Sequence, residues 1–407
     1  MKRDKSRIDL SSIPAKSLVE FDACTRCGEC SIICPTGGEA EQVEERTPRG
    51  KIRAVRKVVR TLRNPLRAAL TSEKKMERML SDLSESVYQC SICGMCMEAC
   101  PLSLRTIEMW ESLRRSLVDS GLGPKEPHEA LVKSIENYDN PWMQPRMQRA
   151  RWAKKIKSIV DATKEKIDLL YYVGCTASYD PEINRVAQNL VSIAEKAGLR
   201  MGILGKAEKC CGSTLLRIGE YERARKLALE NVDIFRRTDA DRIVTACAGC
   251  YKTLAQDYPS LTGTRLPVFH TTQLLAELLS EDRLPLKKDP PGLAVTYHDP
   301  CHLGRHTQMY DWPREIISRL PGVTLVEMER NRERSRCCGA GGGLMTLNQE
   351  IVFRIAGMRI EDAERTGAQV LVTSCPFCQQ TLVEAARRRD NSVKVIDITD
   401  LVIELLE

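Results

Sequence analysis

The stretch AQVLVTSCPFCQQTLVEAA, residues 368–386, has the pattern of an apolar β-strand, a turn at a Cys-x-x-Cys pair that begins with Cys375, and a helix. The stretch DRIVTACAGCYKTLA, residues 241–255, has the same order around Cys247. Strands that alternate with helices predict a parallel sheet with crossover helices. The cysteines would then follow the carboxyl ends of strands, where open α/β sheets bind ligands.

Both stretches belong to a repeat. LLYYVGC, which ends at Cys175, corresponds to LAVTYHDPC, which ends at Cys301, and equivalent cysteines lie 126 to 128 residues apart. Similar apolar segments, residues 271–279 and 398–406, close the two halves. An offset this constant indicates duplicated domains. Each half contains five cysteines: Cys175, Cys210, Cys211, Cys247 and Cys250 in the first, and Cys301, Cys337, Cys338, Cys375 and Cys378 in the second.

Two further cysteine runs lie near the N-terminus. Both have the spacing C-x2-C-x2-C-x3-C-P, which is typical of bacterial [4Fe–4S] ferredoxins, whose fourth cysteine binds the other cluster. Zinc is the alternative, but zinc sites usually use two Cys-x-x-Cys pairs. We therefore predict one cubane cluster on Cys24, Cys27, Cys30 and Cys100, and a second on Cys90, Cys93, Cys96 and Cys34.

A strongly basic segment, residues 47–76, separates these two runs. Ile52, Val55, Val59 and Leu62 recur at helical spacing and predict an amphipathic helix with a basic face. Such a helix can dock to an acidic partner or to anionic lipid. Alternatively, it covers the clusters and offsets their negative charge, which is the interpretation we favour.

We predict a multidomain protein of the α+β/α/β class. A mainly helical, ferredoxin-like domain with the basic insertion covers residues 1–150, and two duplicated α/β domains with parallel-type sheets cover residues 165–286 and 292–407. A linker-like patch at residues 140–155 separates the two kinds of domain. With 407 residues, 42% hydrophobic and 29% charged, the composition is that of a soluble globular protein, and no apolar run approaches the length of a membrane span.

The repeated set of five thiols is one more than a cubane cluster needs. Thiolates are soft ligands that select iron–sulfur clusters, zinc or copper(I), and a fifth ligand favours a multi-iron assembly with a bridging thiolate. Adjacent cysteines reach one cluster only where the backbone turns sharply, which Gly212 and Gly339 permit. The N–H groups of residues 341–343 could donate to cluster sulfurs or to an anion, although glycine runs also form flexible loops.

The repeated C-x(34–35)-CC-x(35–36)-C-x-x-C pattern resembles the CCG domains of heterodisulfide reductases, as do the phrases YHDPCHLGRH, CCGAGGG and VTSCPFC. Two ferredoxin runs ahead of two CCG domains resemble the fused, membrane-associated form of that family. The resemblance implies that each set of five cysteines binds a noncubane [4Fe–4S] cluster. It also implies that a disulfide is reduced between the two clusters to two thiols.

Weaker signals surround the cysteines. His298, His302 and His306 flank Cys301 and suggest a proton donor to a leaving thiolate, or hydrogen bonds around a turn. Lys209 and Arg336 each precede a Cys-Cys pair and suggest either an anionic substrate or compensation of cluster charge. Nucleotide-binding motifs are lacking, so that a flavin would have to reside on a partner.

Two functions remain open. The first is the catalytic subunit of a heterodisulfide-reductase-like complex, with two cubane and two noncubane clusters, and the second is an electron-transfer subunit between a flavoprotein dehydrogenase and a quinone or cytochrome partner. Both need redox partners: a flavoprotein, a ferredoxin-type protein or a membrane cytochrome b. The formal charge of +7 counts cysteines as neutral, although bound thiolates are anionic, so no nucleic-acid partner is expected. A cytoplasmic location is expected, or a peripheral one on the inner face of the membrane through a partner.

Overall fold

The computed structural model describes residues 8–390 and 393–407; the basic residues 1–7 lie outside this range. The chain forms two compact units. Among the described residues, the helical unit comprises 8–130, 214–222 and 339–355, and the duplicated unit comprises 131–213, 223–338, 356–390 and 393–407. The predicted domain limits stay a prediction.

The helical unit contains both ferredoxin runs. Its α3 begins after Thr47, whose Oγ1 accepts a hydrogen bond from the Gly50 N–H at 3.1 Å, and buries Ile52, Val55 and Val58. Val59 is only half-buried, so the apolar face lies slightly to one side of the predicted stripe. The helices are α1 (Ala15–Ala23), α2 (Glu29–Ile32), α3 (Pro48–Arg63), α4 (Pro65–Leu70), α5 (Glu73–Tyr88), α6 (Met95–Glu98), α7 (Thr106–Asp119), α11 (Ser213–Ile218) and α17 (Leu344–Leu347).

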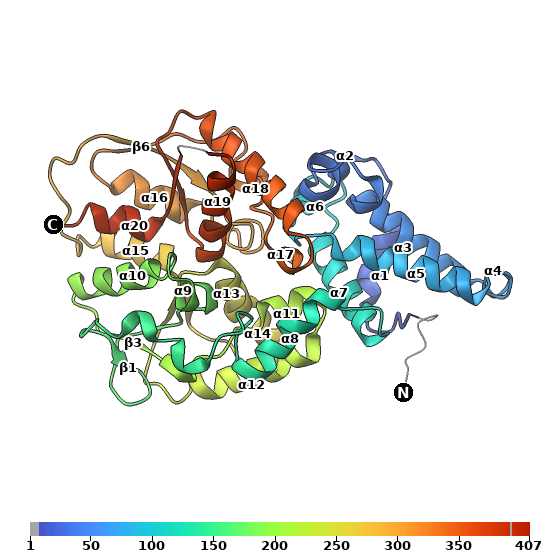
Figure 1. The fold of residues 1–407 in the computed structure, drawn as a ribbon, viewed down its shortest axis with the longest axis horizontal. Helices are drawn as coiled ribbons and strands as arrows, with labels where there is room; N and C mark the ends of the chain where they lie inside the picture. The colour runs from blue at the N-terminus through green and yellow to red at the C-terminus, as the bar shows by residue number, and fades with distance from the viewer. Residues whose placement is uncertain (1–7, 391–392) are drawn as a thin grey trace. The chain divides into compact units, whose positions relative to one another are not determined.

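The duplicated unit contains two parallel sheets with the same topology (Figure 1). Within the described residues the first sheet has the order β1-β3-β2-β4-β5 and the second β7-β6-β8-β9, so the repeat shares a core of four strands and β1 is an addition. The strands are β1 (Val160–Asp161), β2 (Leu169–Tyr171), β3 (Met201–Ile203), β4 (Ile243–Thr245), β5 (Val268–His270), β6 (Leu293–His298), β7 (Val323–Leu325), β8 (Val370–Thr373) and β9 (Lys394–Asp397).

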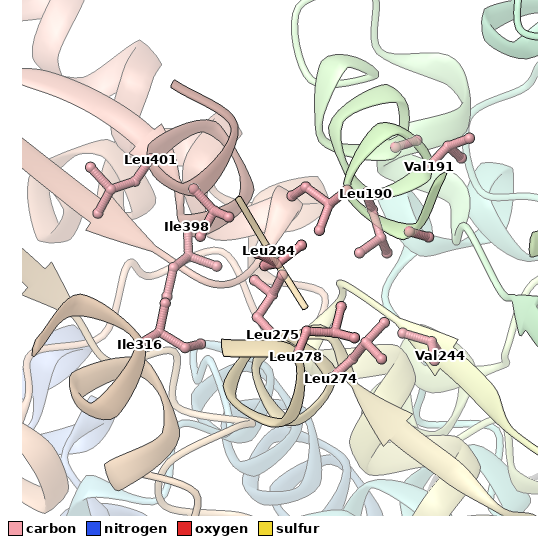
Figure 2. Close-up of a cluster of buried hydrophobic side chains, with 14 of the residues drawn as sticks. Leu190, Val191, Val244, Leu274, Leu275, Leu278, Leu284, Ile316, Ile398 and Leu401 are labelled. Atoms are coloured by element: carbon pink, nitrogen blue, oxygen red, sulfur yellow. The ribbon is translucent and has the colours of Figure 1, made fainter. Parts of the chain in front are cut away.

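The two halves of this unit share one hydrophobic core. Helices α10 (Arg185–Lys196) and α15 (Thr271–Ser280) of the first half contact α20 (Ile398–Glu404) and α16 (Asp311–Arg319) of the second half. Figure 2 shows Leu190, Leu278 and Ile398 among the buried side chains of this core. Because equivalent helices pair reciprocally, the halves are arranged with approximate two-fold symmetry.

The predicted strand–turn–helix segments are confirmed. β4 leads into α13 (Ala248–Lys252), and β8 leads into α19 (Pro376–Arg388). Between the sheet strands the halves also contain α12 (Tyr221–Phe235) and α18 (Gln349–Glu364). The predicted linker at residues 140–155 is wrong in part. Trp152 joins the shared core and Arg149 is buried, because this segment packs against the first half.

Candidate iron–sulfur sites

The first ferredoxin run lines a pocket in the helical unit. Cys24, Cys27 and Cys30 line it together with Cys96 and Cys100 from the second run, so the predicted crossed set shares this pocket with Cys96. Burial, together with the charges of neighbouring thiols, raises the pKa of Cys30 to about 12. A thiol beside other thiols resists ionisation, and a bound metal ion would stabilise its thiolate form. The arrangement therefore suits a metal site. The assignment of these ligands remains a proposal.

The second run is more deeply buried. Burial raises the pKa of Cys96 to about 12, and the charges of Cys90, Cys93 and Cys34 act on it as well. The Cys96 Sγ lies 3.0 Å from Thr106 Oγ1. The structure thus brings Cys34 to the second run, as the crossed arrangement requires, while Cys27 of the first run is exposed.

A buried arginine fixes the backbone beside the second run. Arg114 on α7 is fully buried, and nothing in its sequence context distinguished it from other arginines. A Cβ on Gly342 would lie 2.4 Å from the Cys90 carbonyl oxygen, so only glycine permits this approach. The Arg114 guanidinium donates to the carbonyl oxygens of Arg217 and Gly342 (both 2.6 Å), Val87 (2.8 Å), Cys90 (2.8 Å) and Tyr88 (3.3 Å).

The first five-cysteine site, Cys175, Cys210, Cys211, Cys247 and Cys250, lies in the duplicated unit. The Sγ atoms of Cys211 and Cys250 are 3.5 Å apart, and the thiols of Cys175 and Cys210 are hydrogen-bonded. Hydrogen bonds from Cys210 and Cys250 lower the pKa of Cys211 to about 6. Gly212 has φ +82°, a left-handed conformation that lets the chain turn after the paired cysteines.

An ion pair that the sequence did not indicate supports this site. Arg149 donates to the Glu208 carboxylate at 2.7 Å, and both side chains are about 2% exposed. The Arg149 Nη2 also lies 3.5 Å from Cys175 Sγ, while Glu208 accepts hydrogen bonds from the backbone N–H groups of Val173 and Gly174. Arg149 therefore places a positive charge beside the Cys175 thiol, and Glu208 neutralises this charge.

The second five-cysteine site consists of Cys301, Cys337, Cys338, Cys375 and Cys378. The Sγ atoms of Cys301 and Cys337 are 3.8 Å apart, and those of Cys338 and Cys378 are 3.5 Å apart. Gly339 has φ +89°, which matches Gly212 in the first half. The structure therefore brings the five thiols of each predicted set together; those of the second set are all buried, whereas Cys175 and Cys247 of the first set are partly exposed.

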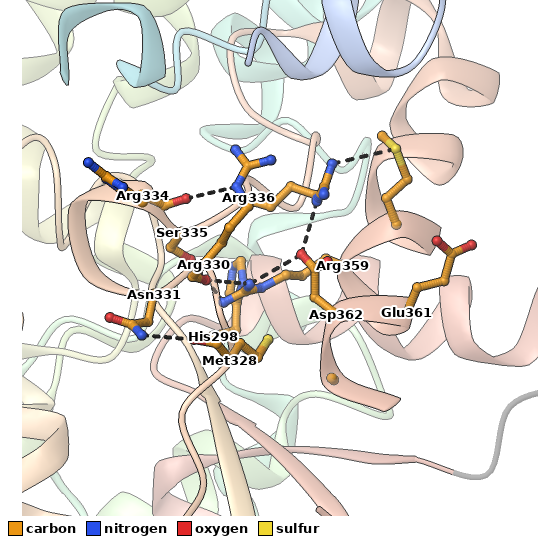
Figure 3. A network of polar contacts seen from close by, with 12 residues as sticks. His298, Met328, Arg330, Asn331, Arg334, Ser335, Arg336, Arg359, Glu361 and Asp362 are labelled. Atoms are coloured by element: carbon orange, nitrogen blue, oxygen red, sulfur yellow. Dashed lines mark hydrogen bonds and ion pairs between the residues drawn. The ribbon is translucent and has the colours of Figure 1, made fainter. Parts of the chain in front are cut away.

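The three flanking histidines occupy different positions. His298 is fully buried and accepts a hydrogen bond at Nδ1 from Arg359 Nε at 3.2 Å (Figure 3). Burial, followed by the charge of Arg359, lowers the pKa of His298 to about 3, so the ring is neutral. His302 Nδ1 lies 3.4 Å from Cys301 Sγ, and its ring stacks on His306 with 4.2 Å between centroids.

Lys209 and Arg336 both pair with carboxylates. Lys209 Nζ lies 2.9 Å from Glu230, and Arg336 Nε lies 3.0 Å from Asp362. Neither contact involves a thiol. Their role as compensating charges or as substrate contacts remains a prediction.

The two five-cysteine sites meet. The thiols of Cys247 and Cys375 are hydrogen-bonded to each other, and this bond together with one from Cys378 holds the pKa of Cys375 well below its usual range. Buried all-thiol donor sets of this kind fit iron–sulfur clusters, because soft ligands select them and bound iron stabilises the thiolates. One edge of each site is thus shared with the other.

The motifs agree with known families. Residues 20–104 match the family model described as "4Fe-4S dicluster domain", and residues 169–255 and 295–383 match the model described as "Cysteine-rich domain". One subunit of the dihydromethanophenazine:CoB–CoM heterodisulfide reductase of Methanosarcina barkeri is 37% identical over 98% of this chain and 97% of its own length. The chain belongs to the family of this heterodisulfide reductase subunit.

Membership of this family confirms the predicted fold class and an iron–sulfur oxidoreductase subunit. The corresponding subunit of Methanosarcina mazei is 36% identical over 100% of this chain and 99% of its own length. The EtfAB:quinone oxidoreductase of Syntrophomonas wolfei is 31% identical over 96% of this chain and 59% of its own length. The family's sequence pattern is therefore shared by proteins whose names indicate different redox reactions.

A solved structure shows the same fold. A hypothetical protein of Helicobacter pylori aligns with a TM-score of 0.59 and 10% identity, and the match covers 96% of this chain and 74% of that chain. Across the described residues, every helix is too short or too polar to span a membrane.

Proposed function

We propose that the chain is the disulfide-reducing subunit of a heterodisulfide-reductase-like complex. The observation that carries this proposal is the junction between the sites, where Cys247 and Cys375 are in contact and both sets of five thiols are complete. A disulfide held at this junction would contact both sites at once. We assign two cubane clusters to the ferredoxin runs and two noncubane clusters to the five-cysteine sites.

The overall reaction takes up two electrons and two protons and converts one disulfide into two thiols. The clusters supply single-electron transfer when they are bound. The chain's own residues bury the sulfur atoms, and one contact between two thiols lies between the two sites. Arg149 and Arg359 balance the negative charge of the thiolates. The electrons come from a redox partner protein, which we place at the ferredoxin runs because Cys27 is exposed there.

A second function is favoured by one of the relatives. The similarity to an EtfAB:quinone oxidoreductase supports an electron-transfer subunit that serves a flavoprotein and a quinone without disulfide chemistry. We prefer the first function because the higher identity and near-complete mutual coverage belong to the heterodisulfide reductase subunits. For both functions we propose a cytoplasmic location, or a peripheral one at the inner face of the membrane through a partner.

One experiment separates the two functions. The protein is purified anaerobically, its iron is counted, and reduction of the CoB–CoM heterodisulfide by a reduced viologen dye is measured. We expect about 16 iron atoms per chain, for four [4Fe–4S] clusters, and release of two thiols per disulfide. In addition, we expect an electron paramagnetic resonance (EPR) signal after oxidation that appears only with added thiol. Full iron content without disulfide reduction or a thiol-dependent signal would contradict the first function and support the second.

A further inference from the structure

We propose that His298, oriented by Arg359, donates a hydrogen bond to the sulfur atoms of Cys338 and Cys378 and makes the second five-cysteine site the stronger electron acceptor of the two. This inference rests on the proposed function, which places a cluster in each site. It adds a difference between the two sites and names the residues that cause it.

The donor is defined by the contacts of the imidazole ring. Arg359 Nε donates to His298 Nδ1 at 3.2 Å, so Nδ1 carries no proton and the neutral ring carries its proton on Nε2. A ring nitrogen of His298 and the Sγ atoms of Cys338 and Cys378 all lie within 4.8 Å of one another. The Nε2 atom is buried and has no hydrogen-bond partner among the described residues. The two sulfur atoms make no hydrogen bond to Nε2 in this structure, and they are the acceptors that we assign to it.

Arg359 is itself held in one orientation (Figure 3). It is fully buried on α18 and donates from Nη1 to the Arg330 carbonyl oxygen at 2.8 Å and from Nη2 to Ser335 Oγ at 3.0 Å. Its carboxylate neighbour Asp362, 3.5 Å away, is also paired with Arg336 at 3.0 Å. Asp362 also pairs with Arg365 at 3.4 Å, so one carboxylate serves three arginines and positive charge remains beside the site.

The first half lacks this arrangement. Tyr172 stands at the position of His298, three residues before the first cysteine of its half, and donates its hydroxyl to the Lys209 carbonyl oxygen at 2.6 Å. Ala224 packs on Gly212, and Val352 packs on the equivalent Gly339. Counted along the chain from Ala224 and Val352, Asn231 of the first half is the equivalent of Arg359 of the second half. Asn231 donates to the Cys210 carbonyl oxygen at 2.9 Å and is neutral.

Physical chemistry gives the direction of the difference. Each electron added to a cluster adds negative charge, and hydrogen bonds to cluster sulfurs and nearby cations stabilise that charge. The second site has an imidazole donor and an incompletely neutralised guanidinium. In the first site the buried Arg149 is matched by Glu208 at 2.7 Å. The second site therefore has the higher midpoint potential.

The test is a potentiometric titration of the anaerobic holoprotein with mediator dyes, followed by EPR. His298→Phe removes the donor and keeps a planar ring, and Tyr172→Phe is the matched control in the first half. We expect His298→Phe to lower the higher of the two five-cysteine midpoints. At fixed potential its reduced-to-oxidised ratio should fall about tenfold, which is about 59 mV for one electron. His298→Gln, which keeps an N–H donor, should recover part of this shift, whereas Tyr172→Phe should leave both midpoints near their wild-type values.

Iron content separates the ways in which the test can fail. His298→Phe with full iron content and an unchanged higher midpoint would overturn the inference, as would equal shifts from His298→Phe and Tyr172→Phe. Should His298→Phe lose iron, Arg359→Gln provides the second measurement, because it frees Nδ1 and should shift the same midpoint downwards; no shift there also overturns the inference. Wild-type protein with only about 8 iron atoms per chain would overturn the proposed function itself.

Discussion

The two five-cysteine sites share their ligands but not their surroundings. In both, paired sulfur atoms lie 3.5 Å apart and a glycine in the left-handed conformation follows the adjacent cysteines. Beside the first site a buried arginine is neutralised by Glu208, and beside the second site Arg359 orients an imidazole towards the thiols. Duplication preserved what binds metal, whereas the charged residues around it diverged.

This contrast separates the features that belong to the cofactor from those that belong to the reaction. Thiols and turn glycines are needed at any cluster of this type, so both halves retain them. Under the proposed function, two single-electron steps on one substrate have no need of two identical sites. The neighbouring charges are free to set the order in which the sites accept electrons.

Cys375→Ser should have the largest effect on iron content and activity, because the Cys375 thiol is hydrogen-bonded to thiols of both sites. We expect a loss of about 4 of about 16 iron atoms and a fall in disulfide reduction of at least about 100-fold. Iron analysis and the viologen-coupled assay measure both quantities. Cys247→Ser is the matched variant in the first half and should behave alike. If Cys247→Ser kept full activity, the junction would not be the site of the reaction.

Arg114→Met should destabilise the helical unit, because Arg114 binds the two segments of this unit that follow the Cys-Cys pairs, at Arg217 and Gly342. Several buried carbonyl oxygens would lose their donor, and we expect a loss of about 3–5 kcal/mol in the free energy of unfolding of the helical unit. Urea unfolding followed by the visible absorbance of the clusters measures it. Arg115→Met, which removes a partly exposed side chain on the same helix, is the control and should cost at most about 1 kcal/mol.

Glu208→Gln should make the first site resemble the second. The amide keeps an acceptor oxygen for only one of the Val173 and Gly174 N–H groups, and it leaves Arg149 without its counter-charge at 2.7 Å. We expect the lower midpoint to rise by about 59 mV, a tenfold change in the reduced-to-oxidised ratio at fixed potential. Asp362→Asn is the counterpart in the second half and should raise the higher midpoint. A downward shift in either variant would contradict the charge argument.

The repeated cysteine spacing was sufficient to predict the duplicated parallel sheets and the convergence of each set of five thiols. It succeeded because ligands at strand ends must follow the periodicity of the fold. The edge strand β1, Val160–Asp161, was missed because two residues carry no periodic signal. Arg149 was placed in a linker because its burial depends on Glu208, which is distant in sequence.

Arg114 and Arg359 show the same limit. Each lies on a helix that carries one other arginine, and only the three-dimensional arrangement shows that these side chains point inward to carbonyl oxygens or to His298. His298 was recognised from its place near Cys301, either as a proton donor or as part of the hydrogen bonding around a turn. Its low pKa and the hydrogen bond from Arg359 favour a fixed neutral donor instead.

The N-caps of the closing helices also differ between the halves. Burial raises the pKa of Asp397 before α20 from 3.8 to about 8, and burial lowers the pKa of His270 before α15 to about 4. A raised pKa in the folded state makes Asp397 favour folding at low pH, and this contribution declines as the pH rises from about 4 to about 8. His270 acts in the opposite direction, since folding is weakened as the pH falls from about 6.5 to about 4.

Asp397→Asn keeps a carbonyl acceptor for the Thr399 N–H and removes the titration. Urea unfolding at a series of pH values should show a flatter profile between about pH 5 and 8, by up to about 1.4 kcal/mol per pH unit. An unchanged slope in this range would show that Asp397 is ionised in the folded protein.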